Sequence, residues 1–343
     1  MYDGIPCPLY PPPGTRRRAL RRSLALALAA VLVTGCGAGS DPGDRAEAAP
    51  AKGFPVTVDN CGVRTTYEEP PSRVVTIHQH PAELMLALGL RDAMVGTAFP
   101  DSAVLPEHRR DFASVPQLAE REPSFEKVLE VEPDFVYGGY GSAFAENEGR
   151  SRRAFADAGI DTYLNREYCG GKEVTMADVY EEIRTIGTVF GVPGRAEKLV
   201  AGLKERLART AEAVRGAPAV PVFVYDSGDK SAFTAGGRGL GTEIIRLAGG
   251  RNVFDDLDEV FGDVSWEQVV ERRPEVIVIY HYRGAGSVER KKRFLLSQPA
   301  LADVPAIRNK RFVVLPLTAT LVGVRPPHAV EDLARGLHPE RFR

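Results

Sequence analysis

Two stretches of the chain decide its architecture: residues 124–136 read SFEKVLEVEPDFV, and residues 265–277 read SWEQVVERRPEVI. Ser, Glu, Val, Glu and Pro recur at the same places in both copies. Each copy opens with a serine suited to cap a helix, continues with apolar residues at helical spacing, stops at proline and enters an apolar run. The sequence therefore predicts the same helix–strand unit twice.

A second repeat lies upstream of each copy. Residues 83–89 (ELMLALG) parallel residues 243–249 (EIIRLAG), and a β-rich run precedes each, RVVTI at 73–77 and PVFVY at 221–225. Because strands alternate with helices, we expect an α/β fold of two lobes of related design, each built on a mostly parallel sheet. The pattern also predicts helices over 174–190 and 193–214, the second long enough to join the lobes beside a ligand cleft.

The N-terminus reads as an export signal. Five arginines precede an apolar stretch at 24–34 that is too short to span a membrane, and residues 33–36 (VTGC) are similar to a bacterial lipobox. Cys36 is then the lipidation site, where fatty acyl chains such as palmitate anchor the protein to the outer face of the cytoplasmic membrane. The alternative is an ordinary secretory signal. We expect a signal peptide over 1–35, a flexible tether over 36–53, lobes over 54–192 and 217–343, and a bridging helix over 193–216.

The remaining cysteines form an even pair. Cys7 leaves with the signal and Cys36 is lipidated, so Cys61 and Cys169 remain in an oxidising compartment. We expect a disulfide between them; the alternative is two buried thiols.

Composition and motifs exclude several classes. With 44 Lys and Arg against 46 Asp and Glu, the chain lacks the basic excess that nucleic-acid binding needs. It has no Gly-x-Ser-x-Gly elbow, phosphate loop or zinc-protease helix, and the glycine-rich run at 236–241 lacks the phosphate-loop lysine. We therefore expect a binding protein rather than an enzyme. We also expect a monomer and no cofactor.

Short motifs in a particular order resemble the substrate-binding lipoproteins of ABC importers for iron siderophores, heme and cobalamin. They lie at 73–76, 82–84, 87–89, 95–97, 130–134, 241–243, 248–254 and 309–316. The resemblance implies two α/β lobes bridged by one helix, with a shallow cleft that takes a ferric siderophore or similar iron(III) chelate. It also implies that one glutamate on the rim of each lobe docks onto permease arginines; by motif these are Glu83 and Glu243. The alternative is that both only favour helix N-termini.

Aromatic and cationic residues after strand ends are the expected ligand contacts. Rings can pack on a flat chelate, and arginine can bind its anionic oxygens. The candidates are Tyr140, Arg166, Tyr168, Phe233, His281, Tyr282 and Arg325.

Other readings stay open. The ligand could be heme or cobalamin, or His78, His80, His281 and Asp226 could hold a bare ion such as zinc. The protein could also be a ligand-sensing surface lipoprotein without a transport role.

Overall fold

The computed structural model describes residues 51–170, 173–284 and 286–343. They belong to one compact unit, Ala49–Arg343. The expected signal peptide, the lipidation site Cys36 and the tether up to residue 50 lie outside the described residues. None of the described helices has the length and apolar character that crossing a membrane requires.

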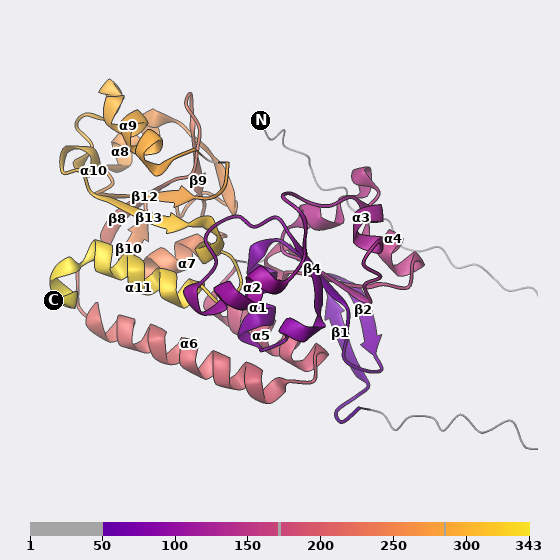
Figure 1. The fold of residues 1–343 in the computed structure, drawn as a ribbon. Helices are drawn as coiled ribbons and strands as arrows, with labels where there is room; N and C mark the ends of the chain where they lie inside the picture. Colours follow the sequence, from indigo (N-terminus) through magenta and orange to yellow (C-terminus); the bar gives the residue numbers. More distant parts are fainter. Residues whose placement is uncertain (1–50, 171–172, 285) are drawn as a thin grey trace, which may run out of the picture. The chain divides into compact units, whose positions relative to one another are not determined.

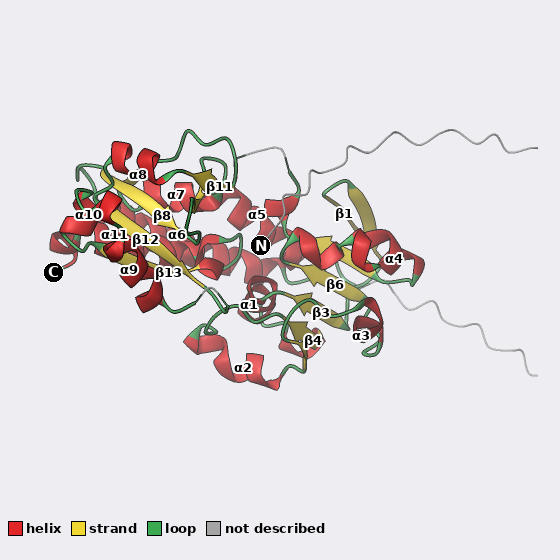
Figure 2. Ribbon diagram, turned by 90° about the horizontal axis from the view of Figure 1, so that it is seen from above, coloured by secondary structure: helices red, strands yellow, loops and turns green. Residues whose placement is uncertain are grey.

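The first lobe contains a five-stranded sheet whose strands are all parallel, in the order β5-β4-β3-β6-β7. Its central strand β3 is fully buried, as expected for a parallel sheet covered on both faces. Helices α3 and α4 cover one face of this sheet, while α1 and α5 (Met176–Val189) lie on the other (Figure 2). Valines of β3 and β6 pack in the core beneath α3 and α4. The strands are β3 (Val74–Ile77), β4 (Met94–Ala98), β5 (Gln117–Ala119), β6 (Phe135–Gly138) and β7 (Asp161–Leu164). The helices are α1 (Gln79–Ala87), α2 (Arg109–Ser114), α3 (Phe125–Leu129) and α4 (Arg152–Asp157).

An antiparallel hairpin, β1 (Val56–Asn60) and β2 (Val63–Tyr67), precedes this sheet. Cys61 in its turn forms a disulfide with Cys169, which follows β7. The Asn60 side chain also donates to the carbonyl oxygen of Leu164 at 2.8 Å and accepts from its N–H at 2.8 Å. Together these bonds hold the hairpin against the end of β7.

The second lobe contains a four-stranded parallel sheet in the order β10-β8-β12-β13 and a two-stranded antiparallel sheet, β11-β9. The strands are β8 (Val220–Tyr225), β9 (Ala232–Ala235), β10 (Gly250–Asn252), β11 (Phe261–Val264), β12 (Val276–His281) and β13 (Phe312–Pro316). The helices are α7 (Leu240–Leu247), α8 (Trp266–Arg272), α9 (Val288–Ser297), α10 (Pro305–Arg308) and α11 (Pro326–Leu337). The predicted α/β fold with a parallel sheet in each lobe is confirmed.

Two helices, α5 (Met176–Val189) and α6 (Pro193–Ala213), lie between the two sheets in the chain. α6 has 21 residues, and at about 1.5 Å per residue it measures roughly 30 Å. It packs against α5 of the first lobe and α11 of the second (Figure 1). An ion pair between Arg206 and Glu331 also ties α6 to α11.

The repeated unit has the same backbone in both lobes. Ser124 caps α3 and Ser265 caps α8, each accepting a backbone N–H three residues on at 3.2 Å. Each unit then reaches its proline through a residue with positive φ, Glu132 at 44° and Arg273 at 47°. The sequence repeat therefore corresponds to a structural repeat.

Candidate functional site

In the first lobe, two histidines bind the backbone of Gly139 and Tyr140, just after β6. His78 Nδ1 accepts from the N–H groups of Gly139 and Tyr140 at 3.3 and 3.2 Å, and His80 Nε2 lies 3.1 Å from the Gly139 carbonyl oxygen. A Cβ at Gly139 would lie 2.4 Å from the His80 ring, so a side chain does not fit there. Because Nδ1 of His78 accepts, its proton lies on Nε2, 3.3 Å from Glu122 Oε1. Burial lowers the pKa of both imidazoles, which keeps them neutral.

These histidines position Tyr140. Its ring centre lies 4.3 Å from that of His78 and 5.6 Å from that of Tyr168. Its hydroxyl donates to Asp101 Oδ2 at 3.3 Å. Asp101 is buried, and burial raises the pKa of its carboxyl group to about 7. The carboxyl ends of β3, β4, β6 and β7 thus meet in one aromatic and acidic cluster.

The second lobe has a comparable arrangement at the end of β8. Asp226 Oδ2 lies 3.4 Å from the donating hydroxyl of Tyr282, which follows β12. Burial raises the pKa of the Asp226 carboxyl group, while the nearby Lys291 opposes that rise. Lys291 itself is buried and donates to the carbonyl oxygens of Asp226 and Tyr280. The backbone of Asp226 also bonds that of Phe233, whose ring stacks on Phe261 at 5.7 Å.

Direct contacts bring the two clusters together. The N–H of Arg283, next to Tyr282, donates to the Asp101 carbonyl oxygen at 2.7 Å. The hydroxyls of Ser102 and Thr318 are 2.9 Å apart. We call Asp101 with Tyr140, and Asp226 with Tyr282, the two carboxyl–phenol pairs. Each lobe contributes one pair. The tyrosine of each pair follows the carboxyl end of a strand, β6 for Tyr140 and β12 for Tyr282.

The expected ligand residues are therefore only partly brought together. Tyr140 and Tyr168 are in contact, and Phe233 and Tyr282 both meet Asp226. His281 ends β12 with an exposed side chain. The two candidate arginines, Arg166 and Arg325, do not contact either carboxyl–phenol pair through a hydrogen bond that the structure shows.

Arg325 differs from expectation because it is buried, with 6% of its surface exposed. Its guanidinium makes two hydrogen bonds of 2.5 Å to the Glu83 carboxylate and one of 2.7 Å to the Ala103 carbonyl oxygen. Arg166 pairs with Asp178 at 3.4 Å and lines a pocket of about 290 Å³ beside the disulfide. In this structure both arginines are already bound to carboxylates of the protein.

The placement of the two predicted docking glutamates also differs from expectation. Glu83 is completely buried; besides Arg325 it accepts from Gln79 Nε2 and the Leu105 N–H, each at 3.1 Å. Only 11% of the Glu243 side chain is exposed, and it pairs with Arg246. A buried, paired carboxylate offers no surface to a partner, so the expected exposure on a rim is wrong for Glu83.

The repeat contains a second pair of glutamates that the sequence analysis did not single out. Glu126 and Glu267 occupy the same place in the two copies, within the first turns of α3 and α8, and both are exposed. Backbone N–H groups of these turns lower the pKa of both carboxyl groups. The signal that could have found them was the aligned repeat itself.

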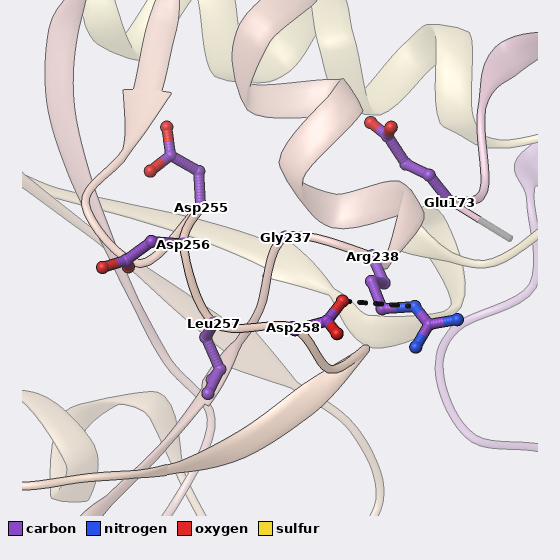
Figure 3. A pocket seen from close by; sticks show the side chains of 7 residues that line it. All are labelled: Glu173, Gly237, Arg238, Asp255, Asp256, Leu257 and Asp258. Carbon is purple, nitrogen blue, oxygen red and sulfur yellow. Dashed lines mark ion pairs between the residues drawn. The ribbon is translucent and has the colours of Figure 1, made fainter.

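A separate acidic pocket of about 490 Å³ lies by the loop before α7. Figure 3 shows Arg238 directed toward Asp258, with 3.8 Å between Nε and Oδ1. None of the expected ligand residues lines it. Its walls are Glu173, Gly237, Arg238, Asp255, Asp256, Leu257 and Asp258.

The bare-metal reading fails for the residues that the structure describes. No group of three or more His, Cys, Asp or Glu side chains among them could hold a metal ion. His78 and His80 bind the Gly139 peptide, and the exposed His281 does not complete a site with Asp226.

Comparison with known proteins identifies the family. The family model described as "periplasmic binding protein" matches residues 74–319 of this chain. The chain belongs to the periplasmic binding protein family. It is a binding protein and not an enzyme.

Similar proteins include the uncharacterized ABC transporter substrate-binding lipoprotein YvrC of Bacillus subtilis, 26% identical over 93% of this chain and 97% of that protein. A cobalamin-binding protein of Halobacterium salinarum is 29% identical over 74% of this chain and 66% of its own length. A solved structure of an ABC-type Fe3+-hydroxamate transport system from Saccharomonospora viridis has 29% identity and a TM-score of 0.70, covering 84% of this chain and 99% of that one.

Proposed function

We propose that this periplasmic binding protein is a lipid-anchored component of an ABC importer that captures a ferric siderophore outside the membrane and delivers it to the permease. The observation that carries the proposal is the meeting of two ring-bearing clusters, one from the carboxyl ends of each parallel sheet. Open α/β sheets bind ligands at those ends. The likeness to a Fe3+-hydroxamate transport structure supports an iron chelate.

A ligand titration tests this function. The chain from residue 37 onward keeps every described residue, and its single tryptophan, Trp266, provides a fluorescence signal. Ferric trihydroxamates, ferric tris-catecholates, hemin and cyanocobalamin are titrated in turn. We expect saturable binding of a ferric siderophore at micromolar or lower concentration, about −8 kcal/mol or better. Saturation by cyanocobalamin alone would replace the iron chelate with a corrinoid.

A corrinoid is the second candidate, because the Halobacterium relative is named for binding cobalamin. Corrinoids carry neutral amide groups whose N–H donors could meet the acceptor oxygens of Asp101 and Asp226. The same titration distinguishes this candidate from the first.

We propose that Glu126 and Glu267, rather than Glu83 and Glu243, dock onto permease arginines. Both are exposed, and the repeat places one on each lobe. An exposed Glu–Arg pair contributes only about 0.2 to 1 kcal/mol, which suits a partner that docks and leaves.

The double variant Glu126→Arg/Glu267→Arg should keep chelate affinity and abolish uptake by cells. Its matched control is Glu130→Arg/Glu271→Arg, which reverses charges one turn further along at equivalent exposed positions. Uptake unchanged in the first variant would refute the docking assignment. Uptake that is unchanged in cells lacking this protein would favour a sensor without a transport role.

A further inference from the structure

Each lobe supplies one carboxyl–phenol pair of the same chemistry. Tyr140 donates to Asp101 Oδ2 at 3.3 Å, and Tyr282 donates to Asp226 Oδ2 at 3.4 Å. Both aspartates are only 5% exposed. The Arg283 N–H bond to the Asp101 carbonyl oxygen places the pairs next to each other across the two lobes.

Asp226 retains an acceptor atom without a partner. Its Oδ2 accepts from Ser227 Oγ at 3.2 Å as well as from Tyr282, whereas Oδ1 accepts no hydrogen bond from any residue between 51 and 343 that the structure describes. Buried carboxylate oxygens are normally satisfied by donors. A ligand carrying N–H groups would supply the missing donor.

Acidic side chains outnumber basic ones around the pairs, and burial raises the pKa of the Asp101 and Glu167 carboxyl groups to about 7. Glu122 lies beside the first pair, where it accepts from Ser142, and Glu167 is buried nearby and accepts from the Val322 N–H. Among the residues that the structure describes, two cations lie beside the pairs. Lys291 already serves two carbonyl oxygens beside Asp226, and Arg283 lies at Asp101 with its side chain exposed.

The arginines that would compensate an anionic ligand are engaged elsewhere. Arg325 is buried against Glu83, and Arg166 pairs with Asp178. A triply anionic chelate would therefore bring its charge close to Asp101 and Asp226 without a free arginine from either position to meet it.

We propose that the two carboxyl–phenol pairs select a neutral or cationic metal chelate bearing N–H donors and reject strongly anionic chelates. This inference rests on the proposed function and narrows its ligand class. Asp101 and Asp226 are then the residues that determine specificity, one from each lobe.

Three ferric chelates of graded charge test the proposal on the chain from residue 37 onward. They are ferrioxamine B, whose pendant ammonium makes it singly cationic, its neutral N-acetylated form, and a triply anionic tris-catecholate. We expect the first two to bind at least about tenfold more tightly than the third. Equal or tighter binding of the tris-catecholate would overturn the inference while leaving the proposed function intact.

Single substitutions connect the selectivity to the residues. Asp226→Asn and Asp101→Asn should each reduce the preference for the cationic chelate over the triply anionic tris-catecholate by about tenfold. Asp229→Asn, an exposed site three residues from Asp226, should leave the preference unchanged. A preference unaltered in both buried variants would refute the role of the pairs. If no chelate or corrinoid binds although circular dichroism shows an intact fold, the proposed function fails and the inference with it.

Discussion

The two lobes share one backbone plan but place its glutamates in different surroundings. Glu83 in α1 and Glu243 in α7 correspond in the sequence repeat, yet the first is buried against Arg325 and the second pairs with Arg246 on its own helix. Glu83 is paired with Arg325 because α1 lies against the segment that follows β13 of the other lobe. Glu243 is paired with Arg246, which lies one turn further along α7 itself. A repeat predicts equivalent backbone, but the neighbours of each side chain depend on which element packs against it.

The largest effect that separates the lobes should come from Glu83. Glu83→Ala leaves the Arg325 guanidinium buried without its carboxylate, so we expect a loss of about 3 to 5 kcal/mol in the free energy of unfolding. Glu243→Ala breaks a pair whose arginine is exposed and should cost about 1 kcal/mol or less. Urea denaturation measures both.

A double variant distinguishes charge from packing. Glu83→Met/Arg325→Met removes both charges together and should recover much of the loss of Glu83→Ala, because the uncompensated charge is gone. Equal losses in the free energy of unfolding for Glu83→Ala and Glu243→Ala would show that the buried pair stabilises the protein no more than the Glu243–Arg246 pair does.

The disulfide belongs to the first lobe alone, since residues 193–343 contain no cysteine. Cys61 and Cys169 are 108 residues apart, and closing a loop of this length stabilises by about 4 to 5 kcal/mol in the chain-entropy model, with a measured range of about 0 to 5. Cys61→Ser/Cys169→Ser should therefore lower the free energy of unfolding by several kcal/mol.

Limited proteolysis locates that effect. We expect the double serine variant to be cleaved first in the hairpin β1–β2, which loses its bond to the end of β7, while the second lobe stays resistant. Cleavage that begins in the second lobe would contradict this assignment.

Much of the fold could be predicted from the sequence because it is encoded locally. Capping serines, helical spacing and a stopping proline predicted α3, α8 and the strands after them, and the long periodic run predicted α6. The hairpin β1–β2 was not predicted as a separate element, because its pairing is antiparallel and lies outside the repeat.

The site was harder to predict because its side chains meet across long sequence separations. Tyr140 and Tyr168, which follow strand ends, are in contact, and Tyr282 reaches Asp226. Phe233 instead lies within β9 and meets Asp226 through its backbone. Position after a strand end failed as a guide for Arg325, whose partner Glu83 lies 242 residues away. The sequence pattern predicts the position of a residue along the backbone, but it does not predict which charged side chain will be its partner.

Glu182 provides a pH-dependent difference between the lobes. It is buried in α5, where it accepts from the hydroxyls of Tyr137 and Tyr163, whereas the buried residues of α7 and α11 are all apolar or glycine. Burial raises the pKa of the Glu182 carboxyl group to about 7. The folded state therefore binds more protons than the unfolded state between about pH 4.5 and 7. As a result, the contribution of Glu182 to the free energy of unfolding falls as the pH rises through that range.

Glu182→Gln should therefore flatten the decline in stability between pH 5 and pH 8, by on the order of 2 to 3 kcal/mol. Unfolding free energies at pH 5, 6.5 and 8 measure the slope. Glu181→Gln, at an exposed neighbouring position on α5, should keep the wild-type slope. An unchanged slope in Glu182→Gln would mean that the group is ionised throughout.

The smallest effects concern the two helix caps, where the repeat is closest. Ser124→Ala and Ser265→Ala each leave one backbone N–H unsatisfied and should each cost about 1 kcal/mol. The two copies of the repeat differ at the third residue after the capping serine, which is Lys127 in one copy and Gln268 in the other. Gln268 Oε1 accepts from the Ser265 N–H at 2.9 Å, a reciprocal bond that Lys127 cannot make because lysine has no acceptor. Gln268→Ala should thus cost roughly 0.5 to 1.5 kcal/mol and Lys127→Ala roughly 0.5 kcal/mol or less, measured by thermal unfolding. Equal costs would show that solvent replaces the reciprocal bond, and that the two caps are equivalent in energy as well as in geometry.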